Sequence, residues 1–126
     1  MKNLKSVHER EVWLIDFEPT RGIEIQKIRP AVVIRKFSKT HFVVLPITSK
    51  SKSEKISVRF SAGFLNTEKN WINISQIRTV DISRFRRKFG KISPAQYLKI
   101  KNKTAKVLQL PPHGAYVAII HDNYKL

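Results

Sequence analysis

Short segments rich in β-branched and aromatic residues recur along most of the chain, and turn-forming or charged residues separate them. Such segments predict β-strands, and roughly five or six of them at this spacing favour a small barrel or sandwich. Inside segment 56–60, Ile56, Val58 and Phe60 alternate with Ser57 and Arg59, which predicts a half-buried strand. We expect strands at 12–17, 31–35, 41–47, 56–60, 71–74 with 76–80, and 88–92, with Pro30 opening the second and a short helical turn at 81–87.

One helix is predicted near the carboxyl end of the chain. Ser93 suits the N-cap, Pro94 the first helical position and Gln96 the capping-box position, and Pro111 with Pro112 would end the helix. The predicted fold class is therefore mainly β with a C-terminal helix, in a single domain over 1–126. The residues expected on the buried face of the helix are Leu98, Ala105 and Leu108, widened by Tyr97, Ile100 and Val107.

Charge indicates the kind of partner. The chain has 25 Lys and Arg against 9 Asp and Glu, a formal net charge of +16. An excess of this size favours nucleic acid, an anionic membrane or an acidic protein as partner. Two basic stretches stand out, at 50–55 and 84–91. Phe85 and Phe89 lie within the second stretch, and we expect one of them to anchor in the core and the other to stack on bases.

Several kinds of chemistry are excluded or disfavoured. The chain has no cysteine, so disulfides, thiolate metal sites and cysteine nucleophiles are excluded. The four histidines are scattered without ligand spacing, so we expect no metal and no cofactor. The apolar runs are far too short to span a bilayer, and we expect a cytoplasmic protein with no membrane partner.

Four short motifs, in order, resemble the MazF, PemK and Kid toxins. Residues 11–24 (EVWLIDFEPTRGIE) resemble the opening strand and loop of that family. Residues 29–34 (RPAVVI), 46–49 (PITS) and 76–81 (QIRTVD) resemble its next motifs, and GKIS at 90–93 followed by a helix completes the order. The likeness covers about 10–109 and leaves 110–126 as an extension.

The resemblance implies a fold and an activity. It implies the SH3-like barrel shared with the gyrase poison CcdB, a homodimer, and the toxin role in a type II toxin–antitoxin system. The implied activity is metal-independent cleavage of single-stranded RNA to a 2′,3′-cyclic phosphate, and the implied protein partner is an antitoxin whose acidic tail covers the basic groove. Two alternatives stay open. One is the same barrel binding RNA or a protein without cutting. The other is a basic DNA-binding domain, which ranks low because this sequence shows no recognition-helix pattern.

The resemblance assigns the main catalytic work to Arg29 and Thr48. RNA carries its own nucleophile, the 2′-hydroxyl, so the protein must move protons and stabilise charge on phosphorus. Arg29 suits charge stabilisation because a guanidinium grips two phosphate oxygens and stays protonated. Glu24 would orient Arg29 or act as the base. The general base and acid stay open, because Ser75 stands where relatives usually carry an acidic residue and Ile23 stands where some carry a histidine or serine.

Other residues are interpreted as binding or structural. Gln76 and Arg78 would contact RNA or support the barrel, whereas Trp13 and Trp71 lie in apolar strand patterns and are predicted to be core residues rather than base-stacking platforms. The residues predicted to bind RNA are Lys27, Lys50, Lys52, Gln76, Arg78, Arg84, Arg86 and Arg87.

Overall fold

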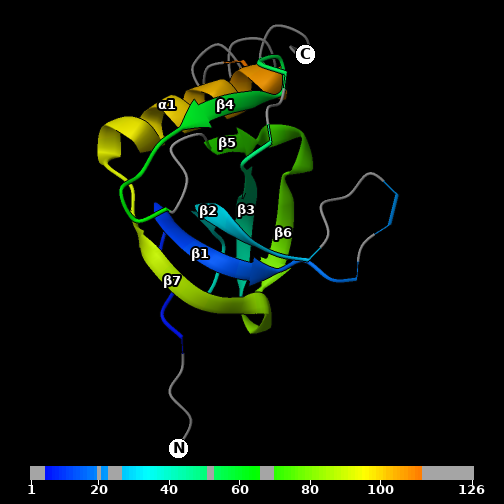
Figure 1. Cartoon of the computed structure of the whole chain (residues 1–126), viewed down its shortest axis with the longest axis vertical. Helices are drawn as coiled ribbons and strands as arrows, with labels where there is room; N and C mark the ends of the chain where they lie inside the picture. The colour runs from blue at the N-terminus through cyan, green and yellow to red at the C-terminus, as the bar shows by residue number, and fades with distance from the viewer. Residues whose placement is uncertain (1–4, 20, 23–26, 51–52, 66–69, 112–126) are drawn as a thin grey trace, which may run out of the picture.

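The computed structural model describes residues 5–19, 21–22, 27–50, 53–65 and 70–111 of the 126-residue chain. These residues form a seven-stranded antiparallel sheet curled into a small barrel, with one helix, α1, lying across one end over β4 and β5 (Figure 1). The predicted class, mainly β with a C-terminal helix, is confirmed. Within these residues, no helix is both long and apolar enough to cross a membrane.

The sheet has strand order β4-β5-β3-β2-β1-β7, and β6 also pairs with β3. Two 3-10 turns, η1 (Ile74–Gln76) and η2 (Ile82–Arg84), interrupt the second half of the chain, and η1 is the break expected between 74 and 76. The strands are β1 (Glu11–Asp16), β2 (Ile28–Lys36), β3 (His41–Thr48), β4 (Ser57–Phe60), β5 (Asn70–Asn73), β6 (Arg78–Asp81) and β7 (Phe85–Lys91), followed by α1 (Pro94–Val107).

Alternate residues of β1, β2 and β3 fill two hydrophobic clusters on opposite faces of the sheet. The first cluster holds Ala31, Val33 and Val44, and it includes Trp13, whose ring meets Phe85 edge-on at 5.7 Å between centroids. Trp13 is 7% exposed, so its predicted place in the core is confirmed. The second cluster, which α1 covers, includes Val12, Val32, Leu45, Ile47 and Ile100.

A buried carboxylate joins the start of β1 to β7. Glu11 is 3% exposed, and its Oε1 accepts hydrogen bonds from Trp13 Nε1 at 3.0 Å and from the His8 backbone N–H at 2.8 Å. Its Oε2 lies 2.8 Å from Lys88 Nζ. Burial raises the pKa of Glu11, but the hydrogen bonds from Lys88, Trp13 and His8 outweigh burial and leave that pKa below its ordinary value. Glu11 is therefore ionised and fully partnered in the folded state.

Three details of the strand predictions were wrong. Ser57 is 1% exposed and donates its hydroxyl to Ser53 O at 2.6 Å, whereas Ile56 is 37% exposed. Because β4 begins at Ser57 rather than at Ile56, the predicted alternation fails at these two residues, whereas it is confirmed at Val58, Arg59 and Phe60. Pro30 is the third residue of β2 and not its first, and β7 begins at Phe85 rather than at 88.

The start of α1 was predicted correctly, its buried face was predicted in part, and its end was not predicted correctly. Ser93 Oγ accepts the Gln96 backbone N–H at 3.1 Å, as an N-cap should, but the Gln96 side chain bonds to Ser61 O instead of closing a capping box. Leu98 and Leu108 are 60% and 42% exposed. Ile100 is buried and Tyr97 and Val107 pack against the second cluster, as predicted. Thr104, whose hydroxyl donates to Ile100 O at 2.7 Å, is buried and was not predicted. The helix ends at Val107, and Gln109 then takes a φ of +58°.

Candidate active site

Arg29 and Thr48 lie on neighbouring strands at the same level. The last recorded pair of β2 and β3 joins Ala31 to Pro46, and the same register continued for two residues along each strand would bring Arg29 and Thr48 opposite one another. Residues two apart share a face of a strand, and Ala31 belongs to the first cluster. Both side chains therefore start from the face of the sheet that α1 does not cover.

The surroundings of these two residues differ. Arg29 is half-buried, whereas Thr48 is 4% exposed. Thr48 Oγ1 accepts the backbone N–H of Lys50 at 3.2 Å, and the hydroxyl has a proton that it can still donate. Lys50 itself is exposed in the loop that follows β3. The catalytic candidate Glu24, the RNA-binding candidate Lys52, and Ile23 lie outside the described residues.

Two residues not predicted as site residues continue the same row. Thr48 is the cross-strand partner of Trp71 on β5, and Trp71 is the partner of Arg59 on β4. The Arg59 guanidinium carbon lies 5.7 Å from the centre of the Trp71 ring. Trp71 is only half-buried, so the prediction of a core residue was wrong in degree. The alternation pattern placed Arg59 outward, but no sequence signal sets the β3–β5 register.

The loop between β1 and β2 is closed at its root. The Phe17 N–H donates to Lys27 O at 3.1 Å, and the Lys27 N–H donates to Glu18 Oε1 at 2.6 Å. Lys27 has a φ of +69°, in the left-handed region that glycine adopts without cost. Because Arg29 follows two residues later, the root of this loop sets where Arg29 enters β2.

Three arginines predicted to bind RNA also bond to protein groups at the end of β1. Arg78 Nη1 donates to Phe17 O at 3.3 Å. Arg84 Nη1 donates to Asp16 O at 3.1 Å and also to Glu18 O. Arg86 Nη2 lies 2.9 Å from Asp16 Oδ2. We call Arg78, Arg84 and Arg86 the arginine brace, since together they hold three consecutive residues at the exit of β1.

Asp16 is the acidic member of this arrangement. Its Oδ1 accepts the Glu18 backbone N–H at 2.9 Å, and this bond, followed by the charge and hydrogen bond of Arg86 and the charge of Arg84, keeps the pKa of Asp16 below its ordinary value. The carboxylate therefore stays ionised and bonded to the brace across the neutral range.

The remaining candidates are dispersed. Arg87 lies with its guanidinium carbon 4.8 Å from the centre of the Phe89 ring, and Phe89 packs against the second cluster. Arg87 therefore does not join the row of Arg29 and Thr48. Gln76 is half-buried in η1, and the exposed Ser75 donates its hydroxyl to Asn73 Oδ1 at 2.7 Å. Among the described residues, no group of three His, Asp or Glu could hold a metal ion.

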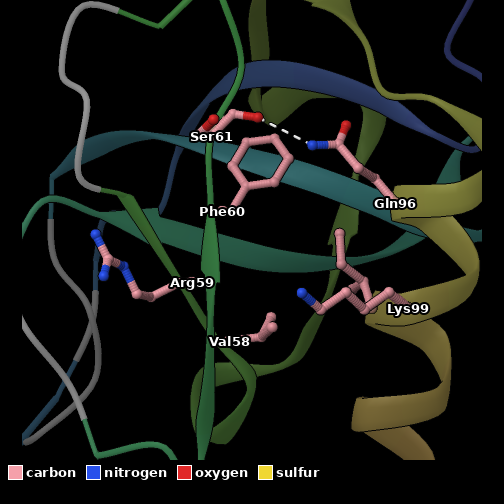
Figure 2. Close-up of a pocket in the computed structure, with 7 residues that line it drawn as sticks. Val58, Arg59, Phe60, Ser61, Gln96 and Lys99 are labelled. Atoms are coloured by element: carbon pink, nitrogen blue, oxygen red, sulfur yellow. Dashed lines mark hydrogen bonds between the residues drawn. The ribbon is translucent and has the colours of Figure 1, made fainter.

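A hollow of about 330 Å³ lies elsewhere, between β4 and α1 (Figure 2). Gln96 Nε2 donates to Ser61 O at 3.0 Å across its mouth, and the side chain of Arg59 points away from α1 (Figure 2). Arg29 and Thr48 do not line this hollow. Arg59 lines the hollow, whereas Trp71 does not, so the hollow adjoins the row at Arg59 alone.

The described residues thus form a small antiparallel barrel in a strongly basic chain. A family model described as "PemK-like, MazF-like toxin of type II toxin-antitoxin system" matches residues 8–108. The chain belongs to this family, and the resemblance drawn from its motifs is confirmed.

Individual relatives agree with the family assignment. "Endoribonuclease MazF9" of Mycobacterium tuberculosis is 28% identical, and the match covers 71% of this chain and 86% of that protein. "Mycobacterium tuberculosis toxin MazF-mt6" superposes with a TM-score of 0.68 at 15% identity, over 82% of this chain and 100% of that one. "Endoribonuclease in complex with its cognate antitoxin from Mycobacterial species" gives 0.67 at 17% identity, over 85% and 99%. The two structures support the barrel fold.

Proposed function

We propose that this toxin is an endoribonuclease that cuts single-stranded RNA without a metal ion. The observation that carries the proposal is the level placement of Arg29 and Thr48 on β2 and β3, in a chain whose family consists of type II toxins. The relative named as an endoribonuclease supports the same activity. A net charge of +16 gives the protein the long-range attraction that a polyanionic substrate needs.

Each residue has a distinct chemical task in the proposed reaction. The 2′-hydroxyl attacks the adjacent phosphorus, the bond to the 5′-oxygen of the next nucleotide breaks, and a 2′,3′-cyclic phosphate forms. Arg29 stabilises the charge that develops on the phosphate oxygens, because its planar guanidinium donates two parallel hydrogen bonds. The Thr48 hydroxyl donates a hydrogen bond to a phosphate oxygen already held by Arg29, and the departing 5′-oxygen takes up a proton. Glu24 orients Arg29 or takes the 2′-hydroxyl proton.

The partners follow from the charge and the family. An antitoxin with an acidic tail would neutralise the basic surface, and one of the similar solved structures is titled as a complex with its cognate antitoxin. The proposed toxin acts as a homodimer in the cytoplasm, where single-stranded RNA is present and where a chain without cysteine loses nothing to reducing conditions.

The test is cleavage of single-stranded RNA by the purified protein in excess EDTA. We expect cleavage with a 2′,3′-cyclic phosphate end, and no cleavage of a DNA strand of the same sequence, which lacks the nucleophile. Arg29→Ala should lower kcat about 100- to 1,000-fold, as losing one oxyanion donor does. Thr48→Ser should retain activity, whereas Thr48→Val, which keeps the shape without the hydroxyl, should lose it.

Arg35→Ala is the matched control. Arg35 lies on the same strand as Arg29 and is exposed, but it pairs with Glu9 at 3.3 Å at the far end of β2. Arg35→Ala changes the net charge as much as Arg29→Ala does, but it leaves the proposed site intact. The Arg35→Ala variant should therefore cut RNA at close to the parent rate. RNA left intact by the parent protein, or equal rates for Arg29→Ala and Arg35→Ala, would refute the proposal. Growth arrest with intact RNA would instead point to a binder that does not cut.

A further inference from the structure

We infer that Trp71 and Arg59 form a subsite for one nucleotide of the RNA, in which the base stacks on the indole ring and the guanidinium binds the adjoining phosphate. This inference rests on the proposed function, because it adds a nucleotide subsite next to the reacting phosphate. It concerns binding and base preference rather than the chemical step.

The position of Trp71 carries the first part of the inference. Trp71 and Thr48 are directly paired across β5 and β3, so their side chains lie on the same face of the sheet with adjacent starting points. Arg29 is level with Thr48 on the other side of β3. A phosphate held between Arg29 and Thr48 would therefore lie next to Trp71, one strand away from it. The nucleotide adjoining that phosphate could then reach the Trp71 ring.

The exposure and shape of the pair carry the second part. Trp71 is half-buried, although a tryptophan with only a packing role would be expected to be covered. Arg59 is exposed, pairs directly with Trp71 across β4 and β5, and holds its guanidinium carbon 5.7 Å from the ring centre. A flat ring with a cation beside it suits a nucleotide, which has a flat base and an anionic phosphate.

The molecule also offers a comparison for this pair. Arg35 lies 6.0 Å from the ring centre of Phe37, which is 62% exposed. This second arginine–aromatic pair has similar chemistry, but it lies at the opposite end of β2 from Arg29, about 20 Å away for six residues of extended chain. Chemistry alone would make both pairs binding sites, whereas the register places only Trp71 beside Thr48. Phe37 therefore serves as the matched control.

Cleavage kinetics test the subsite directly. Trp71→Leu should raise KM for RNA about 10- to 100-fold with kcat nearly unchanged, as expected for the loss of one stacked base. Trp71→Phe, which keeps a ring, should recover most of the affinity. Arg59→Met should raise KM and reduce the slope of log affinity against log salt by about 0.7, the change expected for one phosphate contact on a single strand. Phe37→Leu and Arg35→Met should leave both quantities at parent values.

Fluorescence gives a second test that does not need cleavage. The chain has two tryptophans, and Trp13 is buried in the first cluster, so a base that stacks on Trp71 should quench the parent's emission. The probe is a single-stranded DNA oligonucleotide, which has bases but no 2′-hydroxyl. Quenching should be present in the parent and in Phe37→Leu and absent from Trp71→Phe, in which Trp13 is the remaining tryptophan.

The outcomes separate the subsite from the proposed function. Quenching through Trp71 without RNA cleavage would support the subsite and refute the nuclease. Cleavage with an unchanged KM in Trp71→Leu and equal quenching in Trp71→Phe would refute the subsite and leave the nuclease standing. If Trp71→Leu does not fold, Trp71→Phe and Arg59→Met provide the test. Quenching at the parent level in Trp71→Phe, together with a parent salt slope in Arg59→Met, would overturn the inference.

Discussion

Replacing Lys88 by methionine isolates one charge at the buried Glu11. The substitution keeps the aliphatic part of the side chain and removes the ammonium group that lies 2.8 Å from Glu11 Oε2. Glu11 keeps its hydrogen bonds from Trp13 and His8, so the loss is confined to one charge-assisted contact. Because the Lys88 side chain is 47% exposed, solvent already screens part of this contact, and we expect a cost of about 1–2 kcal/mol near pH 7.

The pH dependence gives this prediction its sign. The pKa of Glu11 is lowered from 4.5 in the folded protein, so its contribution to stability is present above that value and is lost as the pH falls through the folded-state pKa. Without Lys88, burial raises the pKa of Glu11 with less opposition. The difference in unfolding free energy between parent and Lys88→Met should therefore be largest near neutral pH and should shrink below about pH 4.5.

Urea unfolding followed by tryptophan emission, at about pH 7 and about pH 3.5, measures this difference. Lys91→Met is the matched control, because Lys91 is exposed on the same strand and faces Glu11 in the backbone register, although Lys88 makes the ion pair. Lys91→Met should change stability by less than about 0.5 kcal/mol at either pH. A loss for Lys88→Met that stays constant or grows on acidification would refute the electrostatic explanation.

Three further predictions concern the brace, the loop root and β7. Arg84→Met should lower kcat and speed amide exchange at the root of the loop, and should leave the slope of log affinity for RNA against log salt unchanged. Arg87→Met should change neither kcat nor amide exchange. A reduced slope in Arg84→Met alone would mean that Arg84 contacts RNA. Lys27→Gly should raise the unfolding free energy by about 0.5–1 kcal/mol, because glycine relieves the left-handed φ, and a loss in thermal or urea unfolding would contradict this. Gly90→Ala would place a Cβ 2.5 Å from a ring atom of Phe64 and should cost about 1–3 kcal/mol, of which Phe64→Leu should restore a part if that contact is the cause.

The strands and the start of α1 could be predicted because they depend on local sequence. Ser93 followed by Pro94 determines where the helix begins, whatever packs against it. The runs of branched residues in β2 and β3 likewise predict strands on their own. The burial of Ser57 in β4 was missed because it depends on a hydrogen bond to Ser53, which a hydrophobicity pattern does not detect.

The site could be predicted only in part, because its geometry comes from pairing between distant strands. The motifs pointed to Arg29 and Thr48, and the register of β2 and β3 places them level. The same motifs gave no reason to join Trp71 to Thr48, since that pairing depends on how the chain bends at η1. The bonds of Arg78 and Arg84 to the end of β1 could not be predicted, because their acceptors are backbone carbonyls at 16–18 and no sequence motif marks a carbonyl group.

The central strands send alternate side chains into two separate clusters, which limits how a gene for this barrel can change. Removing one codon inside β2 would turn every following residue of that strand over, so that Val32 would exchange places with Val33 and both clusters would lose their fit at once. Lineages that share this barrel should therefore accumulate insertions and deletions between the strands, and should show none within residues 31–34 or 42–47.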